Sequence, residues 1–353
     1  MGEYYSGNKL LTYGKLFNMI LGARNIGKTF WFKRYLLKRF VKHGEPFIYL
    51  RRHNEELKKL DKENFFKKDL LEMVFDNYQE TNIESSQSSH VIEFTSTTKG
   101  FEKGKIVISS NKVTINKTIA VYMKALTKWV DLKGSEYDEI NNILFDEVLI
   151  DMNAPYKHYI KNEVEGLFQL MWSIFRRRTN VHIYLLSNAT NYNNPYFAYF
   201  NFDGDTSKEY YTFNRYDTVI QFPKTKIYTE EEIANNPMLK LTRSSKVYES
   251  NVNNTFQQGD FNRVGKLAGN KEYLFSIDGM GVYSAKEGLF ISDNHEDNRN
   301  FVTESRFLED GTTLLDRNSP PRRLIRNAYY ENQLYYKNVL TKSRFHNVLL
   351  YCL

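Results

Sequence analysis

The sequence predicts an α/β protein: a first domain in which strands and helices alternate, a linker, and a smaller second domain of mixed α+β structure. Two observations support this prediction. Apolar runs typical of buried strands alternate with helical apolar stripes as far as Asn188, and short strand-like segments between Gly and Asp turns begin at residue 271. The expected divisions are residues 1–223 for the first domain, 224–258 for the linker or lid, and 259–353 for the second domain.

The first elements form a βαβ unit. The apolar run at residues 16–21 predicts a strand, and apolar residues spaced among Lys and Arg over residues 29–41 predict an amphipathic helix. Gly44 is expected to end this helix, and Pro46 prevents its continuation. A second apolar segment at residues 46–50 then completes the unit.

An insertion is expected between this unit and the rest of the first domain. Residues 55–78 have a charged, helical pattern. Three short strands joined by Lys, Asn and Gly turns are expected at residues 91–94, 105–109 and 113–122. We interpret this region as an addition to an α/β core.

The alternation then resumes with a strand at residues 142–147, a helix at 162–175 and a strand at 181–186. In the linker, a helical opening after Thr229 is interrupted at Pro237. The strands expected in the second domain, which form a meander, are residues 273–277, 281–284 and 288–292.

Composition excludes several classes of protein. The 353 residues are 41% hydrophobic and 15% aromatic, enough to bury cores, which excludes a disordered chain. The single Cys352 excludes an intramolecular disulfide framework and a cysteine-based metal site. Because no apolar run reaches the ~18 residues of a membrane span and the start lacks a signal-peptide pattern, we expect a soluble, cytoplasmic protein. The net charge of +7 permits a polyanionic partner without requiring one.

A phosphate-binding loop is the most specific motif. Residues 22–29 read GARNIGKT and match G-x-x-x-x-G-K-[ST], in which small residues let backbone N–H groups surround phosphates at the start of a helix. Lys28 would neutralise the β- and γ-phosphates of ATP, and the Thr29 hydroxyl would hold Mg²⁺. The strand before and the helix after disfavour the alternative, a tight turn without a ligand. The expected nucleotide-binding residues are Gly22, Arg24, Asn25, Ile26, Gly27, Lys28 and Thr29.

A pair of acids, Asp146 and Glu147, ends the strand predicted at residues 142–147. At the edge of a parallel sheet where phosphates bind, Asp146 fits the Mg²⁺ shell and Glu147 can polarise an attacking water. An apolar run ending in Asp-Glu also fits an ordinary strand end, but the phosphate loop favours the functional interpretation.

Two further polar groups have a structural alternative. Ser187 and Asn188 end the next strand, where they could sense the γ-phosphate or simply favour a turn. The triplet at residues 176–178 follows a predicted helix, where arginines could cap the helix or supply an arginine finger to a neighbouring subunit. Arg24, inside the loop, could sense phosphate or be solvated.

In order and spacing, these motifs resemble the DNA-packaging (encapsidation) ATPase family of small short-tailed phages with protein-primed linear genomes, a compact relative of the large terminase subunits. The resemblance is dense over residues 10–203 and thin beyond Tyr228. The segments that carry it are GARNIGKT, PFIYLRR, LKGSEYDEINNILFDE, LFQLMWSIFRRR and YLLSNATNYNNPYF.

The resemblance implies an additional-strand (ASCE) P-loop ATPase domain, a lid-like linker, and a C-terminal domain like an RNase H-like nuclease that has lost its chemistry. It also implies a homomeric ring at the portal of a procapsid, acting on double-stranded DNA in the host cytoplasm and absent from the mature virion. ATP would lie between subunits, with Arg176 as a finger acting in trans and Lys133 near the same interface. A structural packaging RNA, known in the family, is not encoded by any feature of this sequence.

A translocating motor is expected to contact the DNA backbone through basic loops. Lysines of the insertion are candidates as a group, although any one of them can be an ordinary solvated side chain. They are Lys99, Lys103, Lys105, Lys112, Lys117, Lys124 and Lys128. The basic tail after Arg317 has the same two interpretations.

Three other functions compete with packaging. One is a helicase or partitioning ATPase of the same superfamily, and another is a terminase with an active nuclease domain. Asp278 and Asp293 offer at most part of a two-metal site, and Asp278-Gly279 also fits a turn. The last is a nucleotide-binding scaffold with negligible turnover, against which Glu147 argues.

Overall fold

The computed structural model describes residues 4–353 except 133–136, 138, 151–158, 161, 189–193, 201, 203–206, 226–227, 246–247, 249–251, 253–263, 266–268, 297, 306–307 and 332. The chain divides into two units. Unit 1 comprises Met1–Thr190 and Thr206–Gln257, and unit 2 comprises Asn191–Asp205 and Gln258–Leu353.

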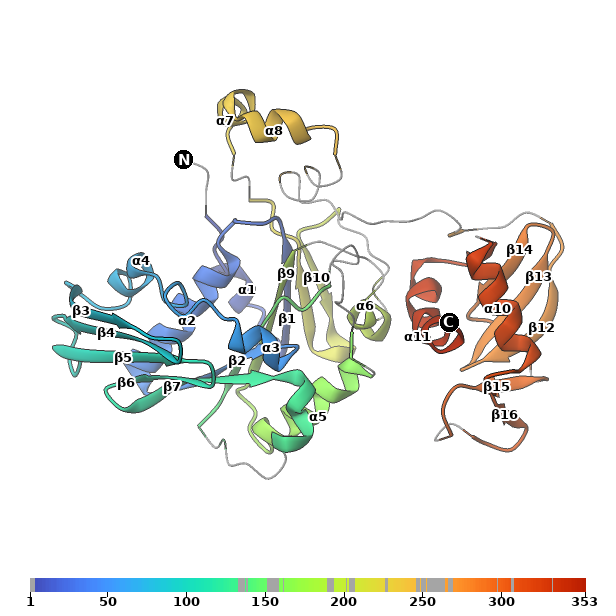
Figure 1. Ribbon diagram of the computed structural model, residues 1–353, viewed down its shortest axis with the longest axis horizontal. Coiled ribbons are helices and arrows are strands. Elements are labelled where there is room, and N and C mark those ends of the chain that lie inside the picture. The colour runs from blue at the N-terminus through green and yellow to red at the C-terminus, as the bar shows by residue number, and fades with distance from the viewer. Residues whose placement is uncertain are drawn as a thin grey trace. The chain divides into compact units, whose positions relative to one another are not determined.

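Unit 1 is built on a single mixed sheet of eleven strands in the described part of the chain (Figure 1). In sheet order the strands are β10 (Tyr210–Phe213), β11 (Thr218–Gln221), β1 (Phe17–Gly22), β9 (His182–Asn188), β8 (Asn142–Asp146), β2 (Phe47–Arg51), β7 (Thr118–Ala125), β6 (Lys112–Ile115), β5 (Lys103–Ser109), β4 (Ser89–Thr95) and β3 (Gln79–Ser85).

The centre of this sheet is parallel. Strands β11, β1, β9, β8, β2 and β7 pair in parallel with their neighbours in that order. Every residue of β1 is buried, as expected for a parallel strand covered on both faces. The α/β prediction is confirmed, and β1, β2, β8 and β9 lie where apolar runs predicted strands.

The expected insertion is an antiparallel extension of the same sheet. Strands β4 and β5 match two predicted segments, whereas the single strand predicted at residues 113–122 is wrong: a turn at Asn116 and Lys117 divides it into β6 and β7, which pair antiparallel. The sequence analysis does not predict β3, which is polar and mostly exposed. The helix expected over residues 55–78 is wrong in extent: two short helices form, α3 (Asn54–Lys58) and α4 (Lys68–Glu72). Between and after them, buried Phe65, Phe66 and Phe75 pack into the main core.

The helices of unit 1 connect these strands. The largest are α2 (Lys28–His43), which follows β1, and α5 (Glu163–Phe175), which precedes β9. Gly44 ends α2 in a left-handed conformation, as predicted. The shorter helices are α1 (Asn8–Leu11), the 3₁₀ turns η1 (Leu126–Leu132) and η2 (Asn214–Tyr216), α7 (Glu230–Asn235) and α8 (Pro237–Thr242).

Unit 2 contains a six-stranded sheet, counted over its described residues. Strands β12 (Glu272–Ile277), β13 (Met280–Ala285) and β14 (Gly288–Ser292) form the predicted antiparallel meander. Strands β15 (Asn300–Val302), β16 (Thr312–Leu314) and β17 (Leu334–Tyr336) were not predicted, because three-residue strands carry little periodicity. The sheet order is β16-β15-β12-β13-β14-β17.

Helices α10 (Pro320–Tyr330) and α11 (Val339–Cys352) complete the core of unit 2. Helix α6 (Pro195–Phe200) packs against α11, and the Ser343 hydroxyl donates to the carbonyl of Asn194 at 2.9 Å. Residues 191–205 therefore belong with unit 2, although the sequence division places them in the first domain.

None of the helices in the described part of the chain is both long and apolar enough to cross a membrane.

Candidate nucleotide-binding site

The loop between β1 and α2 follows directly from the glycine pattern. Gly27 has φ +90° and Asn25 has φ +62°, both in the left-handed region that Gly and Asn tolerate best. A Cβ at Gly22 would lie 2.8 Å from the Ile26 side chain and 3.3 Å from Pro223. The loop therefore needs glycine at its first position for space and at Gly27 for backbone conformation.

Lys28 lies at the start of α2, with 7% of its surface exposed. Its ammonium donates to the carbonyls of Gly22 at 3.0 Å and Ala23 at 2.7 Å, and to Oδ1 of Asn188 at 3.4 Å. Burial lowers the pKa of Lys28 to about 8, although Asp146 nearby opposes the shift. The phosphate-binding lysine is thus held inside its own loop and beside the end of β9.

Asp146 joins the loop to β8. The Thr29 hydroxyl donates to Oδ1 of Asp146 at 3.1 Å, and the Tyr49 hydroxyl donates to Oδ2 at 2.9 Å. Burial, and then Asp146, raise the pKa of Tyr49 well above its usual value, so Tyr49 remains a donor. Hydroxyl and carboxylate oxygens are the ligands that Mg²⁺ prefers, and this pair fits that ion.

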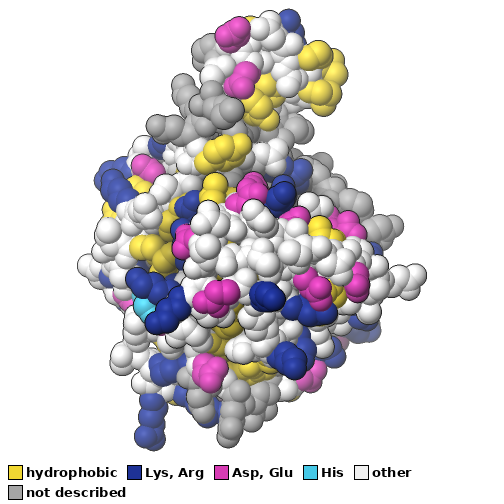
Figure 2. Space-filling view, turned by 90° about the vertical axis from the view of Figure 1, so that its left-hand side faces the viewer, with side chains coloured by type: hydrophobic (Ala, Val, Ile, Leu, Met, Phe, Trp, Pro, Cys, Tyr) yellow, Lys and Arg dark blue, Asp and Glu magenta, His cyan; other side chains and the backbone are white. Residues whose placement is uncertain are grey.

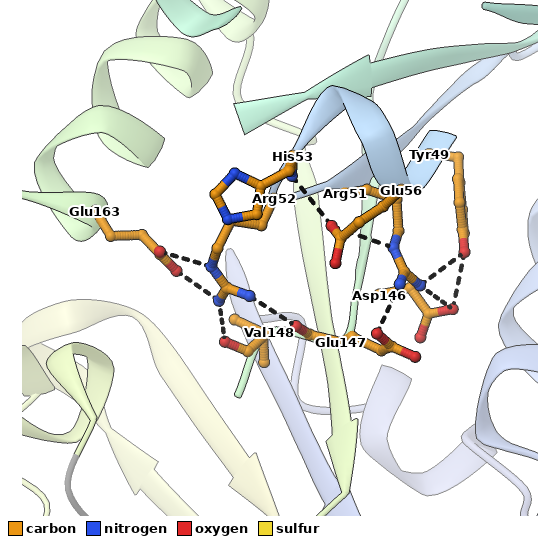
Figure 3. Close-up of polar contacts among 9 residues, drawn as sticks. All are labelled: Tyr49, Arg51, Arg52, His53, Glu56, Asp146, Glu147, Val148 and Glu163. Carbon is orange, nitrogen blue, oxygen red and sulfur yellow. Dashed lines mark hydrogen bonds and ion pairs between the residues drawn. The ribbon is translucent and has the colours of Figure 1, made fainter. Parts of the chain in front are cut away.

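Glu147 follows with φ +60°, a conformation rare for a residue with a side chain. Its carboxylate accepts a hydrogen bond from Nη2 of Arg51 at 2.6 Å (Figure 3). Arg51 also lies 3.7 Å from Asp146 and 3.8 Å from Glu56, while its buried Nε finds no hydrogen-bond partner among the described residues.

Arg51 and the adjacent Arg52 were not predicted as site residues. Arg51 ends β2, the parallel neighbour of β8, so its side chain reaches the same sheet edge as the two acids. The signal for them in the sequence is the Arg-Arg pair that directly follows an apolar strand, within the segment PFIYLRR.

The structure brings Asn188 into the site and places Ser187 beside it. Asn188 contacts Lys28, and the Ser187 hydroxyl accepts from the N–H of Leu149 at 3.1 Å. The end of β9 therefore contacts both the phosphate loop and the segment after Glu147. Arg24 is exposed within the loop, and its charge opposes protonation of Lys28.

The arginine triplet divides into two roles. Arg178 donates to the carbonyls of Phe175 at 3.2 Å and of Tyr137 at 2.9 Å, and also to the carbonyl of Ile174, which accounts for the helix cap. Arg176 and Arg177 are exposed. Side-chain contacts of Arg178 thus support the cap interpretation for that residue, and the backbone N–H of Arg176 donates to the carbonyl of Trp172 at 3.2 Å. The role of the Arg176 side chain stays a prediction, and Lys133 lies outside the described residues.

The insertion lysines do not form a single basic stripe. Lys105 pairs with Glu93 at 2.8 Å and Lys128 with Asp131 at 3.4 Å, whereas Lys124 lies 5.6 Å from the ring centre of Tyr137. Figure 2 shows cationic and anionic side chains interspersed over this face of unit 1. Their contact with DNA stays a prediction.

In unit 2, both candidate acids have structural partners. Asp278, with φ +47°, accepts from the N–H of Thr303 at 2.9 Å and from its hydroxyl at 2.6 Å. Asp293 accepts from Thr341 at 3.0 Å and from Arg344 at 3.3 Å. Among the described residues, no group of three or more His, Cys, Asp or Glu side chains could hold a metal.

A strand, a G-x-x-x-x-G-K-T loop and a helix in a parallel sheet, with a carboxylate from a nearby strand contacting the loop threonine, define a P-loop protein. A family model of podovirus DNA encapsidation proteins (Gp16) matches residues 2–86 and 84–349. The chain therefore belongs to that family, and its function is DNA packaging.

Similar proteins agree with this assignment. A DNA packaging protein of Bacillus phage B103 is 28% identical over 346 residues, covering 95% of this chain and 96% of that protein. The Phi-28 gp11 DNA packaging motor has the same fold, with a TM-score of 0.76 and 21% identity over 100% of this chain and 98% of that one. The N-terminal domain of the DNA packaging ATPase from bacteriophage phi29 is 29% identical, with a TM-score of 0.50. That match covers 64% of this chain and 99% of the phi29 domain.

Proposed function

We propose that this chain is an ATP-hydrolysing motor that drives double-stranded viral DNA into a procapsid. The contact between Thr29 and Asp146 is the observation that carries the proposal, because it joins the phosphate loop to the acidic strand end. Lys28 and Glu147 flank that contact. The four side chains supply a phosphate ligand, a metal-binding pair and a candidate general base at one sheet edge.

The roles follow from the chemistry of phosphoryl transfer. Lys28 binds the β- and γ-phosphates, and Thr29 and Asp146 hold Mg²⁺, which neutralises charge on the phosphates when bound. Glu147 accepts a proton from the attacking water. The contact from Arg51 at 2.6 Å engages Oε2 of Glu147, and a carboxylate can accept further hydrogen bonds, including one from that water.

The sheet order supports an additional-strand ATPase. Strand β9 lies between β1, which leads into the phosphate loop, and β8, which carries the acids. Asn188 at the end of β9 is therefore next to the γ-phosphate position and can sense it through Lys28.

Unit 2 is proposed as an RNase H-like domain without nuclease activity. Three antiparallel strands followed by two parallel strands on the β12 side form the strand pattern of that fold. The engagement of Asp278 by Thr303 and of Asp293 by Thr341 and Arg344 favours packaging over a terminase that cuts DNA.

The family assignment supports a homomeric ring at the portal of the procapsid, with ATP between subunits and Arg176 acting in trans. The motor would work in the host cytoplasm, at the portal vertex, and would be absent from the mature virion. A structural packaging RNA stays a prediction of the family resemblance.

The test is steady-state ATPase activity of the wild type and of Glu147→Gln, each with duplex and with single-stranded DNA. We expect duplex DNA to stimulate the wild type more than single strands do. Glu147→Gln should lower the rate ~10²-fold or more, with nucleotide affinity preserved. Preferential stimulation by single strands would favour the helicase alternative, and a rate within about twofold of wild type would contradict the general-base role.

A further inference from the structure

Arg52 lies at the centre of a buried polar cluster beside the site (Figure 3). Its guanidinium donates to both carboxylate oxygens of Glu163, at 2.7 Å and 2.8 Å. Arg52 is 4% exposed and Glu163 is 2% exposed. Removing two charged groups from water costs desolvation energy, which offsets much of their mutual attraction. The burial of this ion pair is therefore not explained by a gain in stability alone.

The same guanidinium also holds the backbone that carries the candidate base. It donates to the carbonyl of Val148 at 2.6 Å and to the carbonyl of Glu147 at 3.3 Å. The rings of Phe145 and Tyr159 lie against it, with centres 5.8 Å and 5.0 Å away. Arg52, which follows β2, is thereby enclosed by groups from the end of β8, from the segment just after it, and from the start of α5 and the residues before it.

The opposite side of this turn is bound to β9. The N–H of Val148 donates to the carbonyl of Leu186 at 3.0 Å, and the N–H of Leu149 donates to the Ser187 hydroxyl at 3.1 Å. The carbonyls of Glu147 and Val148 thus accept hydrogen bonds from Arg52, and the N–H groups of Val148 and Leu149 donate to β9. A turn held in this way can keep Glu147 in its left-handed conformation.

We propose that Arg52, anchored by Glu163, is a positioning residue that fixes the Glu147–Val148 turn and so places the Glu147 carboxylate for hydrolysis. The inference rests on the proposed role of Glu147. Glu163 is itself fixed as the first residue of α5, and its carboxylate accepts from the N–H of Ile160 at 3.1 Å. Arg52 does not touch the reacting atoms; it acts through the backbone of Glu147.

The test is a double-mutant cycle in the full chain, combining Arg52→Lys with Glu147→Gln. A lysine keeps the charge but cannot donate to Glu163 and to two carbonyls in the same fork geometry. Arg52→Lys should lower kcat about tenfold or more, because small displacements of a reacting group are costly. KM, and the Kd of a fluorescent ATP analogue, should change by less than about twofold, since Lys28 and Thr29 are untouched.

The cycle separates positioning from general stability. If Arg52 acts through Glu147, the double variant hydrolyses ATP no more slowly than Glu147→Gln alone. If the double variant instead loses kcat by the product of the two factors measured for the single variants, the inference is wrong. Rates are expressed per nucleotide-binding site, so that unfolded chains do not contribute. Should Arg52→Lys not fold, Glu163→Gln enters the same cycle, with the same expected and contradicting outcomes.

A matched control removes an arginine–glutamate pair elsewhere in unit 1. Arg39 and Glu45 contact each other at 2.6 Å, with side chains 29% and 25% exposed, away from the acids of β8. Glu45→Gln should leave kcat within about twofold of wild type. A loss equal to that of Arg52→Lys would contradict the inference. Failure of Glu147→Gln to slow hydrolysis would instead contradict the proposed function, whichever result Arg52→Lys gives.

Discussion

The ammonium of Lys28 is buried in the phosphate loop, and its pKa falls from 10.5 to about 8. Below that pH the free protein already carries the charge that binds phosphate. Above it the lysine is neutral, and nucleotide binding must take up a proton because phosphates favour the charged form. We therefore expect the Kd of an ATP analogue to change by less than about twofold between about pH 7.3 and 7.8 and to rise by up to about tenfold per pH unit above pH 8.

Fluorescence titration of the analogue from pH 7.3 to 9.5 measures this slope, in a range above the ionisation of the γ-phosphate, roughly pH 6. Lys33 is a second buried lysine, with a pKa also lowered to about 8, and it donates to the carbonyl of Phe65. Lys28→Arg distinguishes the two, because arginine keeps its charge throughout the range. A slope that persists in Lys28→Arg would show that Lys28 is not its origin.

These residues also show what the sequence could predict about the site. Gly22 to Thr29 form a contiguous motif with a specific conformation, and Asp146 and Glu147 follow a recognisable apolar strand. The partners Arg51, Arg52 and Glu163 carry no such local pattern. Arg51 and Arg52 reach the acids because β2 and β8 are neighbours in the sheet, a pairing between segments about 95 residues apart, and Glu163 reaches Arg52 from the start of α5. No spacing rule in the sequence encodes these contacts.

At the scale of elements, strands β4 and β5 lie so close at one point that only glycine fits at position 104. Gly104 pairs with Phe94, and a Cβ at Gly104 would overlap the buried Phe94 ring. Gly104→Ala should therefore lower the free energy of unfolding of unit 1 by about 1–3 kcal/mol, because the aromatic ring cannot move without disturbing the core. Urea unfolding monitored by circular dichroism measures the difference.

The same pair supplies the control for that prediction. Phe94→Leu alone should destabilise the sheet by removing buried aromatic surface. In the double variant, the smaller leucine makes room for the added methyl group, so the combined loss should be smaller than the sum of the two single losses. Additive losses would show that the ring and the glycine do not interact in this way.

Element prediction succeeded where the pattern was long or sharply bounded. The helix from Lys28 to His43 and the strand β8 follow from periodicity and from Gly44 and the Asp-Glu pair. It failed for β3, whose exposed polar residues show no apolar alternation, and for the three-residue strands of unit 2. Those strands form because a neighbouring strand supplies the hydrogen bonds, which is a property of the sheet rather than of the segment.

For the whole molecule, the proposed ring predicts that neighbouring subunits complete each other's sites. Arg176 follows α5 with φ +49° and is exposed, while Arg178 makes the cap contacts. An exposed arginine at this position is suited to reach the nucleotide of a neighbour, where such a group can raise the rate about 10³-fold or more. Homomers of Arg176→Ala should then bind nucleotide and hydrolyse it slowly.

Mixing two inactive variants tests whether the arginine acts in trans. Arg176→Ala subunits keep an intact phosphate loop, and Lys28→Ala subunits keep Arg176. A mixed ring places some intact loops beside some intact arginines, so DNA-stimulated ATPase activity should reappear and pass through a maximum as the ratio varies. Lys28→Ala mixed with Glu147→Gln is the control, because neither subunit can hydrolyse in its own site. Absence of recovery at every ratio of the first pair, with subunit exchange verified by labelled chains, would place Arg176 in its own subunit's site or outside catalysis.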